Sequence, residues 1–501
     1  MSNDLFSAFA ASVSAHSDKT ALYWGKEQFS YRHFLDQSQR VAARLQKELG
    51  VKPGDRVGIW LRNRPEFVSA LFGILAAGGV AVPINSFLKP VEVGYLVDDA
   101  VLNVLITEEP AEEAVASVQA TRPTLRILRA EDLDRGGSAS FEPTPRLPSD
   151  LAVLIYTSGT TGRPKGAMLT HGNLLHNVES CRQILQIVEV DRIVLLLPMF
   201  HSFMLTVCIF LPLIVGGSIV LIQSLHPPKA MLEELLGNEG TVLPAMAQIF
   251  RALSGLPPGI RLPLRLCISG AGPLPQEILK GFNARHPQVP LIEGYGLSEA
   301  SPVVSVNPVQ GPWIPGTIGV PIPDVEVSVQ DEGGRMLEDK VDGEICVRGG
   351  NVMIGYWNAP EKTAETLVNG WLRTGDIGHR RPDGYYVITD RKKDMLKPNG
   401  INVYPREIEE VVYQFPGIKE CAVVGEVDER RGERPVAFVA LDDGRHLDEK
   451  ALLSFLKERL ADYKLPRRVI TMPALPRNAT GKLLKTSLRE WLRENPGTDA
   501  G

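Results

Sequence analysis

The chain has 501 residues, which is too long for one hydrophobic core, so we expect two or more domains. With 44% hydrophobic and 23% charged residues, its composition is that of an ordinary soluble globular protein. The formal net charge of -5 gives no reason to expect nucleic acid or an acidic membrane surface as a partner.

The N-terminal residues and the cysteines bear on the compartment. Residues 1–6 lack the basic-then-apolar pattern of a secretory signal. The five cysteines are scattered, with no close pair that could bind a metal or act as a redox dithiol. An odd number of widely spaced thiols in a large chain is typical of a reducing compartment, so we predict a cytoplasmic protein.

Short apolar runs alternate with helical patterns along most of the chain. A strand is predicted at residues 57–61, an amphipathic helix at 65–77 and a second strand at 80–84. The same alternation continues with strands at 193–197, 218–222 and 264–269. It predicts mostly parallel sheets covered by helices, an α/β fold.

One uncharged stretch, residues 204–222, is long enough to be tested as a membrane-spanning helix. Pro212 and the pair Gly216-Gly217 divide it, and no Lys or Arg flanks it closely. We therefore expect a buried helix that ends near Gly216, followed by a strand, and no transmembrane segment. Peripheral contact with a membrane stays open, and the oligomeric state is not predicted.

The composition changes near Asp390, because residues 390–402 are first charged and then broken by Gly and Pro. The elements of a small α+β domain follow: a helix opened by Pro405, strands at 421–427 and 436–441, and a helix capped by Asp448. We therefore divide the chain into a large domain, residues 1–390, and a small domain, residues 391–501.

The sharpest local signal directly follows a predicted strand at residues 151–155. Residues 156–166 read Tyr-Thr-Ser-Gly-Thr-Thr-Gly-Arg-Pro-Lys-Gly. Glycines let the backbone turn tightly and bring its N–H groups up to phosphate oxygens, while hydroxyls and a lysine add donors. The run lacks the spacing of a P-loop. A buried strand followed by so many donors favours a phosphate site over a linker, and the candidate residues are Thr157, Ser158, Gly159, Thr160, Thr161, Gly162 and Lys165.

This run resembles the signature loop of the adenylate-forming superfamily, which includes acyl-CoA synthetases, adenylation domains of peptide synthetases and beetle luciferases. Further motifs agree with the family in kind and order at residues 269–275, 293–299, 371–376, 390–394 and 476–482. The resemblance covers nearly the whole chain. It implies a large domain of helix-covered sheets, a small mobile C-terminal domain, and ATP-dependent conversion of a carboxylic acid to an acyl-adenylate, then to an acyl-CoA.

The resemblance assigns roles at the phosphates of ATP. Glu299 resembles the family's Mg²⁺ ligand, a hard oxygen donor suited to a metal that bridges phosphates. Ser298 stands where the family usually has Thr, and either hydroxyl can bond the α-phosphate. Lys482 of the small domain is expected to reach into the site and bridge the carboxylate and the α-phosphate, where negative charge develops.

The resemblance also assigns the nucleoside site. Tyr295 is expected to stack on adenine, and Asp376 with Arg391 to hold the ribose. Taken singly, Tyr295 could be a core residue, Asp376 a turn residue and Arg391 part of a solvated charge run. Only the order and joint presence of the motifs favours the functional roles. The flanking residues assigned to the nucleotide site are Gly270, Ala271, Gly272, Glu293, Gly294 and Gly296.

Three further residues receive a role from the resemblance. His201 is expected to line the acyl site, with a satisfied core histidine as the alternative. Lys393 is expected to be the hinge of domain rotation, with a solvated surface lysine as the alternative. Gly400 is expected to line the tunnel of the coenzyme A arm, because a glycine lets the arm pass close to the backbone.

The acid is predicted from the residues around His201. Amino-acid-activating domains usually have an Asp just after Phe200, where this chain has no carboxylate. The apolar residues expected to line the pocket are Phe203, Met204, Leu205, Val207, Ile209, Val242, Leu243, Ala245 and Met246. Such a pocket suits an acid with no second charge, a medium- or long-chain fatty acid first and an aryl acid second. One methylene changes binding too little for the sequence to fix the chain length.

The acceptor is predicted to be coenzyme A, because the small domain has no added insertion of the kind that hinders rotation in ligases that load carrier proteins. An acyl carrier protein bears the same arm and is the alternative. A catalytically dead adenylate sensor is disfavoured because Lys482, Glu299 and Asp376 are all present. A light-emitting oxygenase would share every motif. We thus expect Mg²⁺ as cofactor, with ATP and coenzyme A as co-substrates.

Overall fold

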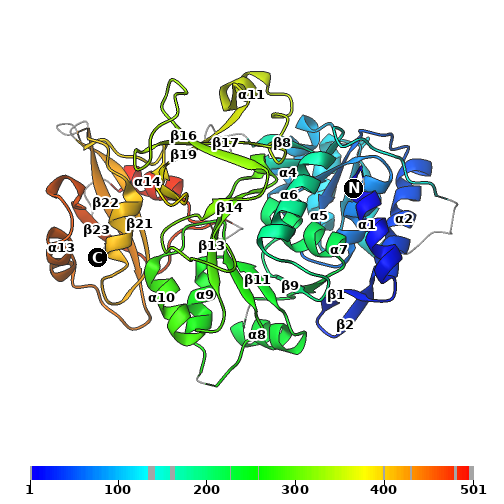
Figure 1. Ribbon diagram of the computed structural model, residues 1–501. Helices are drawn as coiled ribbons and strands as arrows, with labels where there is room; N and C mark the ends of the chain where they lie inside the picture. Colours follow the sequence, from blue (N-terminus) through cyan, green and yellow to red (C-terminus); the bar gives the residue numbers. More distant parts are fainter. Residues whose placement is uncertain are drawn as a thin grey trace.

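The computed structural model describes residues 3–133, 141–157, 164–225, 227–257, 259–398, 401–428, 432–478 and 482–495. Figure 1 shows a larger body that contains three sheets and a smaller body, coloured orange to red, at the C-terminal end of the chain. The architecture of a large N-terminal and a small C-terminal domain is the predicted one. Our division after residue 390 stays a proposal.

The first sheet has six strands in the order β6-β5-β3-β4-β7-β8, and only β8 runs antiparallel to its neighbour. The predicted strand–helix–strand unit is confirmed as β3, α3 and β4, because short buried apolar runs flank a helix that is apolar on nearly every face. The elements are β3 (Arg56–Trp60), α3 (Glu66–Ala76), β4 (Val80–Pro83), α4 (Pro90–Asp99), β5 (Val104–Thr107), α5 (Glu112–Thr121), β6 (Arg126–Arg129), β7 (Leu151–Thr157) and β8 (Lys165–Thr170).

The second sheet has nine strands in the order β15-β14-β13-β12-β11-β9-β10-β1-β2 and is parallel from β13 to β1. It contains the three strands predicted at residues 193–197, 218–222 and 264–269. The elements are α1 (Leu5–His16), β1 (Thr20–Trp24), β2 (Glu27–Ser30), α2 (Tyr31–Lys47), α6 (His171–Ile184), β9 (Arg192–Leu195), β10 (Ser218–Leu221), α8 (Pro228–Gly237), β11 (Val242–Ala245), α9 (Ala247–Ser254), β12 (Leu266–Ser269), α10 (Gln276–Arg285), β13 (Leu291–Gly296), β14 (Val303–Val306) and β15 (Val320–Pro321).

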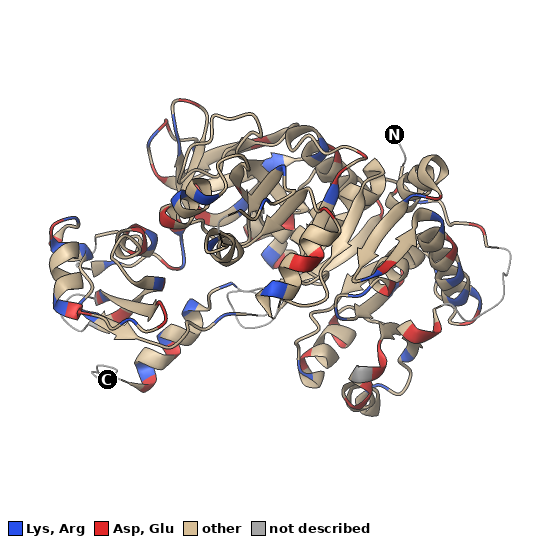
Figure 2. Cartoon of the chain, turned by 90° about the horizontal axis from the view of Figure 1, so that it is seen from below, with Lys and Arg blue, Asp and Glu red and all other residues tan. Residues whose placement is uncertain are grey.

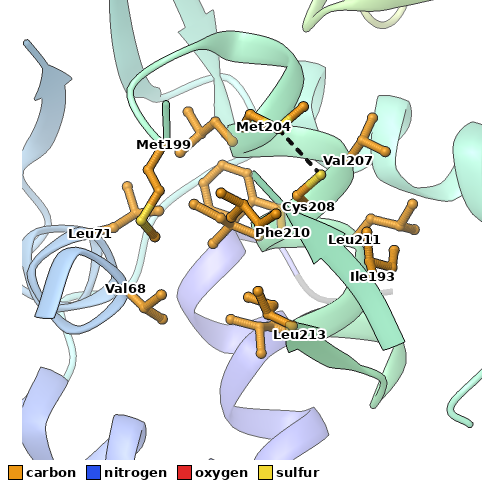
Figure 3. Close-up of a cluster of buried hydrophobic side chains, with 14 of the residues drawn as sticks. Val68, Leu71, Ile193, Met199, Met204, Val207, Cys208, Phe210, Leu211 and Leu213 are labelled. Carbon is orange, nitrogen blue, oxygen red and sulfur yellow. Dashed lines mark hydrogen bonds between the residues drawn. The ribbon is translucent and has the colours of Figure 1, made fainter. Parts of the chain in front are cut away.

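The uncharged stretch forms a buried helix, as predicted. A π-helical segment, Met204–Phe210, continues into α7 (Leu211–Val215), which ends at Gly216 in the left-handed conformation with φ +93°. Figure 3 shows Met204 and Phe210 in one cluster with Leu71 of α3, which explains why no charge is tolerated there. Within the described ranges, no helix is long and apolar enough to cross a membrane.

The third sheet is antiparallel, which the strand–helix alternation of the sequence does not predict. It lies above β13 and β14 in Figure 1 and contains β16 (Val325–Gln330), β17 (Gly343–Gly349), β18 (Leu367–Val368), β19 (Trp371–Arg380) and β20 (Tyr386–Arg391), with α11 (Pro360–Thr366) beside it. Its other strands are joined by turns and loops, and α11 lies in the connection from β17 to β18, since antiparallel neighbours need no crossover helix.

The small domain matches its predicted elements. Asp448 caps α13 by accepting a hydrogen bond from the Ala451 N–H at 3.0 Å, and Pro405 opens α12. Ile408 and Val412 of α12 are fully buried in the domain's own core. The elements are α12 (Pro405–Val412), β21 (Ile418–Asp428), β22 (Gly432–Leu441), α13 (Glu449–Lys457), β23 (Arg468–Thr471) and α14 (Lys485–Glu494).

The two domains touch on the side of α9 and α10 (Figure 1). Arg251 of α9 donates to the Lys419 carbonyl at 2.9 Å and to Asp442 Oδ1 at 2.6 Å.

Basic and acidic residues are interspersed over the surface helices, whereas the strands of the large sheets carry few charges (Figure 2). The five cysteines are all buried and unpaired, and burial raises the pKa of the Cys346 thiol to about 11.

Candidate active site

The sequence motifs meet at one edge of the nine-stranded sheet. β9, β11, β12 and β13 are neighbouring parallel strands, so their carboxyl ends lie side by side. His201 follows β9, Gly270 follows β12, and Ser298 follows β13. Crevices outside the carboxyl ends of such strands are the usual ligand sites of α/β sheets.

Asp376, Arg391 and Tyr295 form one hydrogen-bonded cluster. Asp376 on β19 lies directly opposite Arg391 on β20 in the antiparallel register, and Arg391 Nε is 3.1 Å from Asp376 Oδ1. The Tyr295 hydroxyl donates to Asp376 Oδ2 at 2.6 Å. Burial, then the nearby Asp376 carboxylate, raises the pKa of Tyr295 well above its usual value, so the hydroxyl stays a donor. The structure thus brings together the three residues predicted for the nucleoside.

The glycines of the nucleotide motifs have packing reasons of their own. A Cβ at Gly296 would lie 2.2 Å from the Pro302 carbonyl oxygen, so only glycine fits there. A Cβ at Gly270 would lie 3.0 Å from the Phe203 ring, whereas Gly272 has open space around it. Ala271 adopts φ +64° in the left-handed region, which turns the backbone directly after β12.

Glu293 contacts the small domain. Its carboxylate accepts from the Leu274 N–H at 3.3 Å and lies 3.7 Å from Arg406 Nη2 of α12. Burial raises the pKa of Glu293 to about 7, although Arg406 opposes the shift. A Cβ at Gly294, one residue further along β13, would lie 3.4 Å from Val306 Cγ2, an ordinary van der Waals distance.

Ser298 and Glu299 lie on a short 3₁₀ turn, Ser298–Ala300, after β13. Ser298 Oγ is 2.9 Å from Ser202 Oγ. Glu299 Oε1 accepts a hydrogen bond from the Tyr356 hydroxyl at 2.8 Å. Asn351 fixes the backbone of the turn by donating to the Ala300 carbonyl at 3.0 Å.

The signature loop is described only at its two ends. Thr157, the last residue of β7, lies opposite Lys165, the first residue of β8. The Lys165 ammonium group is 5.5 Å from the centre of the Tyr356 ring. The predicted phosphate donors between these ends, Ser158, Gly159, Thr160, Thr161 and Gly162, lie outside the described residues, as does Gly400.

The donor set around Glu299 fits Mg²⁺. Mg²⁺ is usually bound in nucleotide sites by one or two carboxylates together with substrate phosphates. Glu299 presents such a carboxylate, and its hydrogen bond to Tyr356 uses Oε1. Over the part of the chain that is described, no three His, Cys, Asp or Glu side chains cluster as a complete metal site.

Lys482, from the small domain, is close enough to Arg391 and Asp376 for their charges to act on its ammonium group. Its backbone N–H donates to Asn478 Oδ1 at 2.8 Å. Partial desolvation and then repulsion by Arg391 lower the pKa of Lys482 to about 8, while Asp376 opposes the shift. The residue keeps exposed surface, so its charge is only partly removed from water.

His201 is neutral at physiological pH. Burial and, to a smaller extent, the Lys482 ammonium group lower its pKa to about 4. Its Nδ1 accepts a hydrogen bond from the Phe203 N–H at 3.2 Å, so the proton of the neutral ring is on Nε2. The structure therefore places His201 within the electrostatic field of Lys482.

Lys393 lies between a residue fixed to the large domain and one fixed to the small domain. Arg391 is the last residue of β20, a strand of the large domain that runs one residue past our proposed division, whereas Asp394 Oδ1 accepts from Arg489 Nη2 of α14 at 2.6 Å. Burial and the neighbouring Arg391 lower the pKa of Lys393. This position is the one expected of a hinge, and the role itself stays a proposal.

The predicted acyl pocket is mostly solid core. Seven of the nine apolar residues proposed to line it are at most 1% exposed: Met204, Leu205, Val207, Ile209, Val242, Leu243 and Ala245. Phe203 and Met246 are the two that keep accessible surface. The sequence pattern is therefore explained first by core packing.

Tyr356 and Arg406 are contacts of the site that the sequence reasoning missed. They meet Glu299 and Glu293 across 57 and 113 positions of the chain. No local periodicity relates residues so far apart. The aromatic pair Tyr356-Trp357 after Gly355 was the one local signal available.

Comparison with known proteins decides the family. A family model described as AMP-binding enzyme matches residues 9–357, and one described as AMP-binding enzyme C-terminal domain matches residues 407–482. The chain belongs to the AMP-binding enzyme family. It is an AMP-forming acid–thiol ligase, as the resemblance of its motifs predicts.

Individual members of this AMP-binding family agree over the full length. A long-chain-fatty-acid–CoA ligase of Bacillus subtilis (strain 168) is 34% identical, with 98% of this chain and 95% of the relative covered. A feruloyl-CoA synthase of an Amycolatopsis species is 36% identical, with 96% of each covered. The crystal structure of ATP-bound MatB from Rhodopseudomonas palustris has a TM-score of 0.92 at 31% identity, with 99% of each chain covered. The apo form of MatB has a TM-score of 0.79.

Proposed function

We propose that the chain converts a carboxylic acid with an uncharged tail to its coenzyme A thioester in two steps. A carboxylate oxygen attacks the α-phosphorus of ATP, the bond to the bridging oxygen breaks, and pyrophosphate leaves. The thiol sulfur of coenzyme A then attacks the acyl carbon, AMP leaves, and the thiol proton is released. The observation that carries the proposal is the hydrogen-bonded cluster of Asp376, Arg391 and Tyr295, whose charges also act on Lys482 of the small domain.

Different residues are proposed to serve different functions in the first step. Asp376, held by Tyr295 and Arg391, has its oxygens fixed where ribose hydroxyls can donate to them. Lys482 and Arg391 supply the positive charge that a pentavalent phosphorus requires, and their mutual repulsion in the absence of an anion favours binding of one. Mg²⁺ held by Glu299 would neutralise charge on the departing pyrophosphate.

The arrangement of the two domains supports a conformation suited to adenylate formation rather than to thioester formation. Both MatB structures have the same identity to this chain, so the higher TM-score with the ATP-bound form, 0.92 against 0.79, reflects the arrangement of parts. In this arrangement the charges of Arg391 and Asp376 act on Lys482. For thioester formation we propose that the small domain turns about Lys393 and removes Lys482 from the site.

A medium- or long-chain fatty acid is the first proposed substrate class. It is supported by the long-chain-fatty-acid–CoA ligase relative and by the absence of a carboxylate beside His201. An aryl acid is the second candidate. It is favoured by the similarity to feruloyl-CoA synthase and by the packed core behind Phe203 and Met246, because a long chain would have to displace buried side chains there.

Product analysis tests the proposal. The purified chain, ATP, Mg²⁺, coenzyme A and a panel of fatty and aryl acids are incubated, and AMP, pyrophosphate and thioester are quantified by mass spectrometry. We expect one AMP and one pyrophosphate per thioester formed. ADP and orthophosphate as primary products would refute the proposal. Thioester formed only on an acyl carrier protein would replace coenzyme A, and an oxidised acid would indicate the oxygenase alternative.

A further inference from the structure

Residues 353–357, here called the strap, join the phosphate-loop strand β8 to the turn that carries Glu299. On the β8 side, the Met168 N–H donates to the Gly355 carbonyl at 2.9 Å, and the Trp357 N–H donates to the Gly166 carbonyl at 2.8 Å. Ala167 and Tyr356 form an antiparallel bridge between these bonds. The strap is therefore fixed to the strand that leaves the signature loop.

On its other side the strap holds Glu299 twice. The Met353 N–H donates to the Glu299 carbonyl oxygen at 2.8 Å, and the Tyr356 hydroxyl donates to the Glu299 carboxylate at the same distance. The first bond fixes the backbone of the turn, and the second fixes the direction of the side chain. Tyr356 is 9% exposed, so little water competes for this hydroxyl.

Gly355 is required for this geometry. It adopts φ +144°, which side chains rarely allow, and a Cβ there would lie 2.8 Å from Thr363 Cγ2. The Thr363 hydroxyl oxygen accepts from the Tyr356 N–H at 2.9 Å. α11, which contains Thr363, thus supports the strap from behind and holds the Tyr356 ring between Lys165 and Glu299.

A glutamate on a short turn has several side-chain rotamers, and only some of them present an oxygen to a nucleotide-bound metal. A hydrogen bond from a neighbouring residue selects among them, and the loss of such a partner typically lowers metal affinity by about 10–100-fold. In this chain the Tyr356 hydroxyl uses Glu299 Oε1, which leaves Oε2 for a metal. The Lys165 ammonium group over the ring adds a favourable contact to the same tyrosine.

We infer that Tyr356 is a positioning residue that orients Glu299 for the Mg²⁺ of Mg·ATP and ties this orientation to the strand of Lys165. This role rests on the proposed ATP-dependent activity. In this role Tyr356 contacts neither the nucleotide nor the metal. The strap transmits the position of β8, and with it the end of the phosphate loop, to the carboxylate.

The test compares Tyr356→Phe with the unmodified chain and with a matched control, Tyr385→Phe. Tyr385 is 5% exposed and donates its hydroxyl to the Pro312 carbonyl at 2.8 Å, away from Glu299. Mn²⁺ binding in the presence of a non-hydrolysable ATP analogue is measured by electron paramagnetic resonance. We expect Tyr356→Phe to weaken Mn²⁺ binding about tenfold. Tyr385→Phe should stay within twofold, and both variants should bind the metal-free analogue normally.

A double-mutant cycle excludes a purely structural role. If Tyr356 acts through Glu299, adding Tyr356→Phe to a Glu299→Gln chain should weaken Mn²⁺ binding no further. An equal loss in both backgrounds, or unchanged Mn²⁺ affinity in Tyr356→Phe, would overturn the inference. So would a Tyr356→Phe chain that unfolds at a clearly lower temperature than Tyr385→Phe while the cycle shows no coupling.

The proposed reaction and the positioning role of Tyr356 can be refuted independently of each other. A chain that binds Mn²⁺ and the analogue, shows the Tyr356 effect and yet makes no AMP would sink the proposed reaction and keep the positioning role. A chain that makes AMP normally, but in which Tyr356→Phe leaves Mn²⁺ binding unchanged, would refute the positioning role and keep the proposed reaction. No metal–nucleotide binding by the unmodified chain would refute both.

Discussion

The lowered pKa of Lys482 gives the adenylation step a distinctive pH dependence. Desolvation and the Arg391 guanidinium lower this pKa to about 8, whereas a free lysine titrates near 10.4. A lowered pKa means that the proton is lost at lower pH. With this value, about nine-tenths of the chains carry the cation at pH 7 and about one-tenth at pH 9. We therefore expect kcat/KM for pyrophosphate release to be flat near pH 7 and to fall about tenfold per pH unit above pH 8.

Stopped-flow pyrophosphate release without coenzyme A, from pH 7 to pH 10, measures this profile. Bound phosphates should raise the Lys482 pKa again, so kcat, which reports the bound enzyme, should fall at higher pH than kcat/KM. Lys482→Arg is the control: it keeps its charge throughout, so its lower rate should lose the decline. A flat profile to pH 9.5, or the same decline in Lys482→Arg, would refute the assignment of the titration to Lys482.

Four further outcomes are expected. Lys482→Ala should slow adenylation by about 10²–10³-fold, yet form thioester from pre-made acyl-adenylate at nearly the normal rate, as single-turnover assays would show. Lys393→Pro fixes φ and should retain single-turnover pyrophosphate release but lose thioester formation, whereas Lys393→Gln should retain both; loss of neither in the proline variant would contradict a hinge. Glu299→Gln should raise the Mg²⁺ concentration needed for half-maximal rate, and an unchanged requirement would remove Glu299 from the metal site. Phe203→Ala should shift preference in the acid panel toward bulkier acids, and the same ranking as in the unmodified chain would show that Phe203 does not bound the pocket.

The sequence predicts best where one local pattern has one physical cause. The buried helix that ends at Gly216 and the cap of α13 by Asp448 follow from residues within a few positions of each other, and both are confirmed. The nucleoside cluster could be predicted only through resemblance, because Tyr295 and Asp376 are 81 positions apart and meet across two different sheets.

Sequence patterns that can have two physical causes gave a wrong prediction or none. The uncharged residues after Phe203 fit an acid pocket and a packed core equally well from sequence, and the structure makes most of them core. Gly296 fits a nucleotide loop and a tight backbone contact equally well, and Pro302 lies against it. The antiparallel third sheet has no alternation of strands with helices, which was the signal used to predict the other two sheets.

The five buried cysteines have a practical consequence for watching this enzyme work. Burial raises the pKa of Cys181 to about 12 and that of Cys346 to about 11, and it raises those of Cys208, Cys267 and Cys421 as well. Protonated, inaccessible thiols react slowly with maleimides and disulfide reagents. A reporter cysteine can therefore be added to the surface of each domain and labelled with a fluorophore while the native cysteines stay in place. Energy transfer between two such dyes would follow the turning of the small domain during a catalytic cycle.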